Sequence, residues 1–254
     1  MASTYSWIGG TLGAWADPAA WTPAGGPPGA TDRADLNDGF AVTSSGVPGD
    51  GAAGAVNSGA GTFTGSFTFD SLYVGDVFEH ETTLTSGVDR IGAIQSRGTL
   101  VVTQATVAAG PVMLGEPPVE GPFLPRPQTG KLILRDHGTL TADAFVLYQG
   151  TDLTILGMDA TSLLEIGSAG TGAVGTLTVD ADGSIMGAGV VVAPVLLNRG
   201  TVAISYIEGT VLNDGTLFAG VSAGVNNGVM SGSISNVVNN GTITGGSIRS
   251  VTST

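Results

Sequence analysis

Apolar and polar residues alternate along much of this chain with the two-residue period of a β-strand. In residues 62–69, for example, Phe63, Phe67 and Phe69 share one parity and threonines occupy most of the other. Successive side chains of a strand point to opposite faces, so this pattern gives each strand one apolar and one polar face. Similar short segments recur between small-residue turns over residues 35–107. The pattern predicts an all-β protein made of many short, half-buried strands.

A repeated corner follows in the C-terminal fifth of the chain. Four times an apolar residue precedes an asparagine, and a glycine and a β-forming residue follow two and three positions after that asparagine. The four glycines, 15, 13 and 13 residues apart, are Gly200, Gly215, Gly228 and Gly241. Asparagine and glycine tolerate the left-handed backbone of a sharp corner. A short strand, a fixed corner and another short strand, repeated, predict a coiled β-solenoid.

The spacing of the corners leaves two alternatives for the size of the coils. Degenerate corners at Gly98, Gly138 and Gly175 are 40 and 37 residues apart, intervals that would hold two coils of about 20 residues each. The later 13-residue intervals are too short for a three-sided coil with ordinary strands. Either the C-terminal coils are smaller or two-sided, or the asparagine–glycine pattern marks different corners in turn.

All three tryptophans, Trp7, Trp15 and Trp21, lie within residues 1–36 among glycines and prolines. The first coil of a solenoid has no neighbour on one side, and bulky aromatic residues with turn formers can cover its core and blunt its edge strand. We therefore expect an N-terminal cap. The alternative is a platform on which sugar rings stack, and we favour the cap because repeat arrays generally need atypical terminal units.

The same segment resembles a known family of bacterial surface proteins. Residues 5–10 (YSWIGG), 15–21 (WADPAAW) and 28–32 (PGATD) are similar to the W-x-GG, W-x-D-x-x-x-W and P-G-x-x-D opening of β-helical passenger regions in bacterial autotransporters and related proteins. The Asn-x-Gly-Thr corners are typical of the same group. The resemblance covers about 30 residues at the start of the chain. It implies a β-helix at the cell surface or outside the cell and says almost nothing about activity.

Together these features predict a single parallel β-solenoid of the right-handed β-helix type. Residues 1–36 would form the cap and residues 37–254 the solenoid. A proline-rich segment at 110–130 interrupts the rhythm, with prolines at Pro111, Pro117, Pro118, Pro122, Pro125 and Pro127. Proline cannot donate a hydrogen bond within an interior ladder, so we expect a lateral loop there. It is either a tolerated insertion or an arm that contacts a neighbouring subunit or ligand.

Composition limits the choice of function. Hydrophobic residues make up 42% of the 254 positions and charged residues only 11%, which excludes a disordered chain despite 42 glycines. The net charge of -13 argues against nucleic acid and anionic membranes as partners, because both require clustered basic residues. Cysteine is absent, so thiol chemistry plays no part. No apolar run approaches the ~18 residues of a membrane span, and residues 1–5 lack the features of a signal peptide.

Candidate metal ligands are few. Asp180 and Asp182 precede Gly183 and resemble half of a calcium loop, but calcium needs six to eight oxygen ligands and the other carboxylates are not at loop spacing. A second cluster of this kind lies at residues 35–39, where Asp35, Asn37 and Asp38 precede a glycine. An ordinary Asx turn is the favoured interpretation of both. We predict no cofactor and leave calcium open.

Catalytic residues do not stand out either. His80 and His137 lack the spaced partners of a zinc or nucleophile site, and no Gly-x-Ser-x-Gly elbow is present. A β-helical polysaccharide lyase or glycosidase would need acidic or basic groups converging on one face. Arg135, Asp136, Asp143 and Asp152 would do so only if the coils stacked in register. We therefore predict a protein that is not an enzyme and keep the lyase or glycosidase as an alternative.

Charge is unevenly distributed, and this suggests a role. Residues 201–254 carry a net charge of -1 out of -13, from Glu208, Asp214 and Arg249. Natural β proteins protect exposed edges with charge, proline or a covering helix, and this end has little of any. We therefore expect an extracellular or cell-surface structural protein that polymerises with itself, head to tail or by strand addition, into a filament. The residues expected to carry assembly are Trp7, Trp15, Trp21, Asn226, Asn227, Asn239, Asn240, Ile248 and Val251. An adhesin that binds a polysaccharide is the main alternative.

Overall fold

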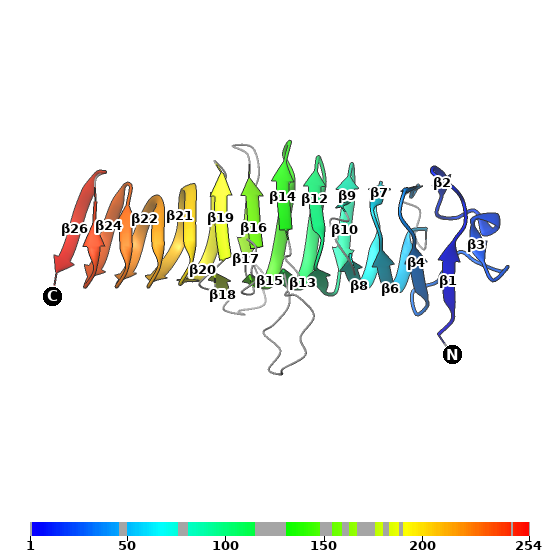
Figure 1. Ribbon diagram of the computed structural model, residues 1–254, viewed down its shortest axis with the longest axis horizontal. Coiled ribbons are helices and arrows are strands. Elements are labelled where there is room, and N and C mark those ends of the chain that lie inside the picture. Colours follow the sequence, from blue (N-terminus) through cyan, green and yellow to red (C-terminus); the bar gives the residue numbers. More distant parts are fainter. Residues whose placement is uncertain are drawn as a thin grey trace, which may run out of the picture.

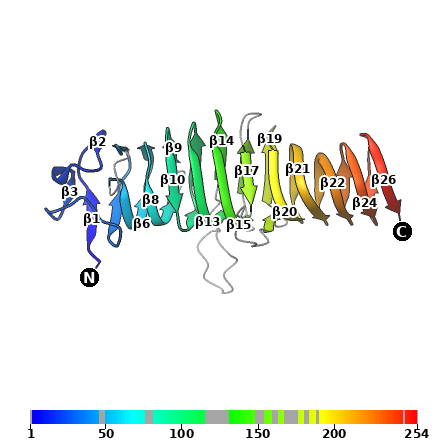
Figure 2. The same cartoon turned by 180° about the vertical axis from the view of Figure 1, so that it is seen from behind.

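The computed structural model describes residues 2–45, 50–75, 81–114, 131–147, 154–158, 163–166, 176–179, 183–187, 190–244 and 246–253. The fold is all-β, with 67% of residues in strands and 2% helical, which confirms the predicted class. The strands stand side by side along one long axis, with the two termini at opposite ends (Figures 1 and 2). No helix of the described residues has the length and apolar character needed to cross a membrane.

The N-terminal third contains short strands and one turn of 3₁₀ helix. The elements are β1 (Thr4–Trp7), β2 (Gly13–Ala14), η1 (Pro18–Ala20), β3 (Trp21–Thr22), β4 (Arg33–Leu36), β5 (Phe40–Thr43), β6 (Ala52–Ser58), β7 (Gly61–Thr64) and β8 (Thr68–Val74). The middle third continues with β9 (Glu81–Thr85), β10 (Val88–Ile91), β11 (Ile94–Ser96), β12 (Thr99–Thr103), β13 (Thr106–Leu114), β14 (Lys131–Arg135), β15 (Thr139–Leu147), β16 (Thr154–Met158) and β17 (Leu163–Ile166).

The C-terminal third has the longest strands of the chain. Its elements are β18 (Thr176–Val179), β19 (Gly183–Gly187), β20 (Val190–Asn198), β21 (Thr201–Asn213), β22 (Thr216–Asn226), β23 (Val229–Ser231), β24 (Ile234–Asn239), β25 (Thr242–Ile243) and β26 (Ile248–Ser253).

Strand pairing is parallel along the body of the molecule. For example, β4 pairs with β6, β6 with β8, and β8 with β11, so each strand hydrogen-bonds to one about a coil further along the chain. The exception is β3, which pairs antiparallel with β1 at the N-terminal end. Two paired parallel strands need a connection that brings the chain back to the end at which the first strand began. The turns between successive strands provide that connection.

The alternating pattern determines which side chains form the core. An inward row runs in register through Ala34, Val56, Leu72, Ile94 and Val112, one residue per strand, and every member is buried. The same row continues through Phe145, Leu177, Leu196, Val211 and Val237, which are buried too. These rows belong to a single apolar cluster that extends from Trp7 to Val237.

Strand register resolves the question of coil size. Asn198, Asn213, Asn226 and Asn239 pair with one another in successive strands, so the C-terminal corners are one corner repeated in coils of 13 to 15 residues. The smaller-coil alternative is therefore the one observed. By contrast, the corners at Gly98 and Gly138 are not equivalent, because Thr99 pairs with Lys131 whereas Thr139 pairs with Thr106.

The expected loop at 110–130 begins later than predicted. Strand β13 continues to Leu114 and includes Pro111, which pairs with Ala144 of β15. On its other side β13 faces the break between β10 and β11, so the missing N–H of Pro111 lies at a corner where the ladder is already interrupted. Residues 115–130, which hold the other five prolines of this segment, lie outside the described part of the chain.

Candidate functional site

The three tryptophans pack together at the N-terminal end of the core. Trp15 is fully buried, and Trp21 and Trp7 are 2% and 5% exposed. Their rings meet edge to face, with centroids 4.8 Å apart for Trp15 and Trp21 and 5.0 Å for Trp7 and Trp21, and Trp15 also contacts Phe67 and Phe69. The rings are covered by the protein's own side chains, which argues against the sugar-stacking platform.

The small residues of the opening motifs explain how these rings fit. A Cβ added at Gly9 would lie 2.5 Å from Cζ2 of Trp7, so any larger residue would displace the indole. The indole Nε1 of Trp7 donates to the carbonyl of Gly10 at 3.0 Å, and that of Trp21 donates to the carbonyl of Trp15 at 2.9 Å. Asp17 caps η1 by accepting a hydrogen bond from the N–H of Ala19.

The aspartate of the third motif fastens the first strand. Oδ1 of Asp32 accepts from the N–H of Ser3 at 2.8 Å and Oδ2 accepts from the N–H of Gly29 at 3.0 Å. These two backbone donors, Ser3 first, lower the pKa of the Asp32 carboxyl because they favour its charged form. Asp32 therefore ties the start of β1 to the turn that precedes β4.

The C-terminal corners contain a buried ladder of side-chain amides. Nδ2 of Asn198 donates to Oδ1 of Asn213, Nδ2 of Asn213 to Oδ1 of Asn226, and Nδ2 of Asn226 to Oδ1 of Asn239, each at 2.7 Å. The first three asparagines are 1% exposed or less. Each of these three also donates to the carbonyl of a residue after the next corner, for example Thr216. The ladder thus satisfies the polar groups at a corner that lies inside the molecule.

A second, solvent-exposed ladder lies beside it. Nδ2 of Asn227 donates to Oδ1 of Asp214 at 2.7 Å, and Nδ2 of Asn240 donates to Oδ1 of Asn227 at 2.9 Å. Of the four asparagines assigned to assembly, Asn226 and Asn239 therefore belong to the inner ladder and Asn227 and Asn240 to the outer one. All four bind neighbouring coils of their own chain.

The last strand, β26, lies at the C-terminal end of the stack. It pairs in parallel with β24, and among the described residues no strand pairs with its other side. Arg249 is the one charged residue of this strand. Ile248 and Val251, predicted to act in assembly, belong to β26 and pair in register with Ile234 and Val237.

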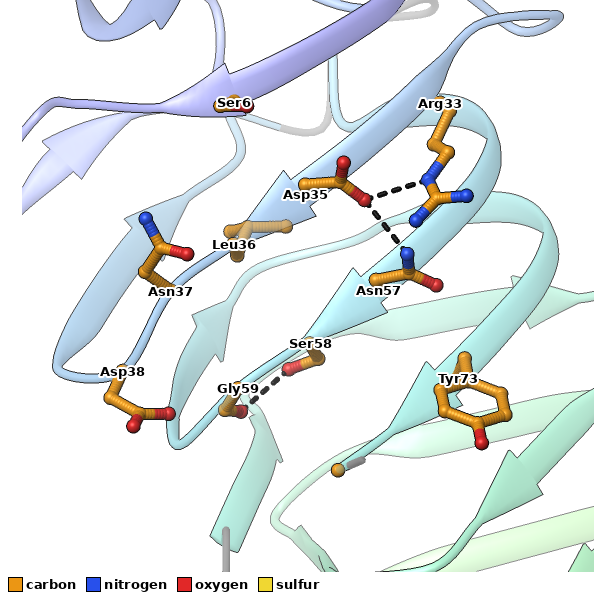
Figure 3. A pocket seen from close by; sticks show the side chains of 11 residues that line it. Ser6, Arg33, Asp35, Leu36, Asn37, Asp38, Asn57, Ser58, Gly59 and Tyr73 are labelled. Carbon is orange, nitrogen blue, oxygen red and sulfur yellow. Dashed lines mark hydrogen bonds and ion pairs between the residues drawn. The ribbon is translucent and has the colours of Figure 1, made fainter. Parts of the chain in front are cut away.

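A polar groove crosses the outer face of the N-terminal strands (Figure 3). It has a volume of about 550 Å³, and most of its lining residues come from β1, β4, β6 and β8, with Asn37, Asp38, Gly59 and Gly75 added by the adjoining turns. Ser6, Asp35, Asn57 and Tyr73 pair in register, one per strand, and Arg33 lies two residues before Asp35. We call these five residues the Asp35 groove. Its members are far apart in the sequence, so only the strand register brings them together.

One carboxylate organises this groove. Oδ1 of Asp35 accepts from Nε of Arg33 at 2.7 Å and from Nδ2 of Asn57 at 2.8 Å, as the dashed lines in Figure 3 show. Asp35 is 31% exposed and Arg33 52% exposed, so both remain within reach of a ligand. At the far end of the row, the guanidinium of Arg97 lies 5.2 Å from the ring centroid of Tyr73.

The neighbouring cluster at residues 37–39 has a structural role. Oδ1 of Asp38 accepts from the N–H of Ala60 in the next coil at 2.9 Å, and Gly39 has a left-handed backbone with φ of 82°. A Cβ on Gly59 would clash with the Asp38 carboxylate. These contacts support the turn interpretation of the cluster over a calcium loop.

The buried carboxyl of Asp89 was not singled out from the sequence. It is 1% exposed, and its Oδ1 accepts from the N–H of Phe67 at 2.9 Å, while Oδ2 has no partner among the described residues. Burial raises the pKa of Asp89 to about 7, and the Phe67 hydrogen bond opposes this only in part. The alternation of β10 places this aspartate on the inward face, the one signal that marks it in the sequence.

The remaining predicted residues do not form a site that can be described. Asp180 and Asp182, together with His80 and Asp152, lie outside the described residues. Over the described ranges, no three His, Cys, Asp or Glu side chains gather as metal ligands would. Arg135 and Asp143 are exposed on β14 and β15, which pair with different strands, and Asp136 accepts from Oγ1 of Thr103. His137 follows in the same turn, with φ of 66°.

No model of a known protein family matches this chain, and no curated protein or solved structure matches it.

Proposed function

We propose that this chain is a non-enzymatic structural protein of the cell surface or extracellular space, built as a single parallel β-solenoid. Its register supports this proposal, because one inward row continues from Ala34 to Val237 without a break in parallel pairing, and every side chain of the row is buried except at Gly224, which has none. A right-handed coil is favoured because parallel crossover connections are almost always right-handed. The location outside the cell rests on the resemblance of the opening motifs.

We further propose that the protein associates with itself through β26, and the open side of that strand is the observation that carries this proposal. An unpaired parallel edge offers a row of backbone donors and acceptors to a strand of another chain. The strand contains one charge and no proline, so little protects it from pairing. A second copy of the chain is the partner that the predicted self-assembly requires.

The two ends of the molecule are different, and this favours one mode of association. At the N-terminal end, β1 pairs with β4 on one side and with β3 on the other at Ser6 and Trp7. Strand β3 thus covers two of the four residues of that edge. We call residues 7–22, which hold the three tryptophans, the tryptophan segment. Two copies joined through their β26 edges need no rearrangement, whereas a head-to-tail filament requires β3 to be displaced. Strand addition at β26 is therefore the first step that we propose.

The direction of the backbone groups in β26 identifies a position that tests this proposal. The N–H of Ile234 donates to the carbonyl of Ser247 at 2.8 Å, so residue 247 faces β24. Backbone groups of adjacent residues point to opposite sides of a parallel strand, which places those of Ile248 on the open side. Ile248→Pro removes one outward donor and leaves the bonds to β24 in place.

Light scattering over a range of protein concentrations is the measurement. The wild-type chain should approach twice the monomer mass or more as concentration rises, and Ile248→Pro should remain monomeric. Ile248→Val keeps the N–H and is the matched control, so it should associate like wild type. A wild-type chain that stays monomeric at the highest concentration, with or without calcium, would contradict the proposed self-association. Equal association of all three chains would show that another surface carries it.

A further inference from the structure

We propose that the Asp35 groove binds a neutral carbohydrate chain lying along the long axis of the protein. This binding site is independent of association through β26. It lies on β1, β4, β6 and β8, at the end of the molecule opposite β26 (Figure 1).

The groove is arranged as a repeating surface. Ser6, Asp35, Asn57 and Tyr73 follow one another on adjacent strands, at the spacing of roughly 4.8 Å that separates neighbouring strands. This distance is comparable to the length of one sugar ring in an extended oligosaccharide. Successive rings could therefore meet successive side chains of the row, and this periodic match favours a chain over a single small molecule.

The hydrogen-bonding groups suit hydroxyl pairs. Oδ1 of Asp35 is occupied by Arg33 and Asn57, while Oδ2 has no partner among the described residues. The terminal nitrogens of Arg33 and Oδ1 of Asn57 also have no hydrogen-bond partner among the residues that the structure describes. The groove thus presents two acceptors and a planar donor. A vicinal diol, which both donates and accepts, complements this set.

The shared contact with Asp35 also holds the three side chains in place before a ligand arrives. Pre-ordering of this kind lowers the entropy lost on binding. An aromatic ring next to a few fixed polar groups is a usual composition for a small-ligand site, and Tyr73 supplies the ring. The Arg97 guanidinium, 5.2 Å from the ring centroid, orients that ring.

The charge of the groove and of the whole chain favours neutral over acidic carbohydrates. Arg33 is paired with Asp35 at 2.7 Å, and Asp38 also lines the pocket, so the lining has no excess of positive charge. The whole chain carries -13, which repels an acidic polysaccharide at long range. A neutral glycan avoids this repulsion and uses the same hydroxyl contacts.

Calorimetric titration of the full chain with defined oligosaccharides tests the proposal. The neutral probes are cellohexaose, chitohexaose and maltohexaose, and the comparison probes are hexagalacturonate and calcium chloride alone. We expect at least one neutral hexasaccharide to bind at millimolar concentration or below. Hexagalacturonate and calcium should give no heat of binding that depends on the groove.

Three variants locate the binding. Tyr73→Ala and Asp35→Ala should each weaken binding by about tenfold or more, as expected for one central contact. Tyr206→Ala is the matched control, because Tyr206 is an exposed tyrosine on β21, and it should bind like wild type. Far-ultraviolet circular dichroism and a thermal melt establish that each variant is folded. Asn57→Ala replaces any groove variant that is not.

Two results would overturn the proposal. One is the absence of binding by all three neutral hexasaccharides. The other is binding that folded Tyr73→Ala and Asp35→Ala retain at wild-type strength, which would place the glycan elsewhere. Binding of hexagalacturonate alone is a case of the first result, and it would contradict the proposed selection for neutral sugars.

Discussion

A single asparagine in each C-terminal coil satisfies the polar groups of a buried corner. The glycine two positions later has a different role from the one predicted. Gly215, Gly228 and Gly241 do not have a left-handed backbone; instead, a Cβ on each would lie 2.1 to 2.2 Å from the carbonyl oxygen of the preceding glycine in the stack. Glycine is required here because the coils approach closely, and asparagine because its amide both donates and accepts along the stack.

Alanine substitutions of the adjacent Asn226 and Asn227 should therefore lower the free energy of unfolding by very different amounts. Asn226→Ala removes one acceptor of the Asn213 Nδ2 and the Nδ2 donor that binds both the Oδ1 of Asn239 and the carbonyl of Thr242. It should therefore lower the free energy of unfolding by about 2 kcal/mol or more. Asn227→Ala removes only exposed hydrogen bonds and should cost less than about 0.5 kcal/mol. Urea denaturation measures both. Equal losses would show that burial of the inner ladder is not what stabilises the corner.

Asp89 should make stability depend on pH. Burial raises its pKa from 3.8 to about 7, so between these values the folded protein holds a proton that the unfolded chain has lost. The stabilising effect of this proton is complete below the unfolded pKa and disappears as pH rises through 7, at a cost of a few kcal/mol. Asp89→Asn should melt higher than wild type at pH 8 and should lose this dependence. A wild-type melting temperature that rises from pH 4 to 7, with no change in Asp89→Asn, would contradict this assignment.

At the scale of elements, the tryptophan segment completes the N-terminal end of the core. Strand β3 turns back antiparallel on β1, and Trp21 in β3 brings its ring against Trp15 and Trp7. Trp15 links this group to Phe67 and Phe69 of the following coils. The segment is thus part of the same apolar cluster as the strands that follow it.

Truncating the central ring tests that role. Trp15→Ala should lower the free energy of unfolding by about 3 to 5 kcal/mol, because it removes a fully buried indole and leaves a cavity. Ile8→Ala, at a side chain that is 60% exposed in the same segment, should change it by less than about 0.5 kcal/mol. Guanidinium denaturation followed by circular dichroism measures both. A small effect of Trp15→Ala would show that the segment does not stabilise the remaining coils.

Local sequence patterns predicted strands and which of their side chains are buried. They carry no information on which strands pair with one another. Alternation at Phe63, Phe67 and Phe69 correctly placed these rings in the core. It could not show that Gly98 and Gly138 belong to different corners, since that depends on which strands pair. Nor could it show that Pro111 fits inside β13, because the gap between β10 and β11 lies in another coil. The Asp35 groove was missed for the same reason, as its residues span four strands.

At the scale of the whole molecule, the outer face changes character from one end to the other. The outward row that begins with Ser6, Asp35, Asn57 and Tyr73 includes Leu212 and Val238 near the C-terminal end, 38% and 39% exposed, before it ends at Thr252. Charge follows the same trend, since residues 201–254 carry only -1 of the total -13. A polar N-terminal end and a charge-poor C-terminal end fit the proposed division of roles between glycan binding and association.

Negative-stain electron microscopy of the purified 254-residue chain tests the proposed structural role most directly. Strand addition at β26 predicts straight rods of twice the single-chain length, with the two tryptophan ends outermost. A continuous filament would mean that the β1 edge opens as well. Rods of single-chain length alone, at concentrations where light scattering has been recorded, would contradict self-association, and compact round particles would contradict the β-solenoid itself.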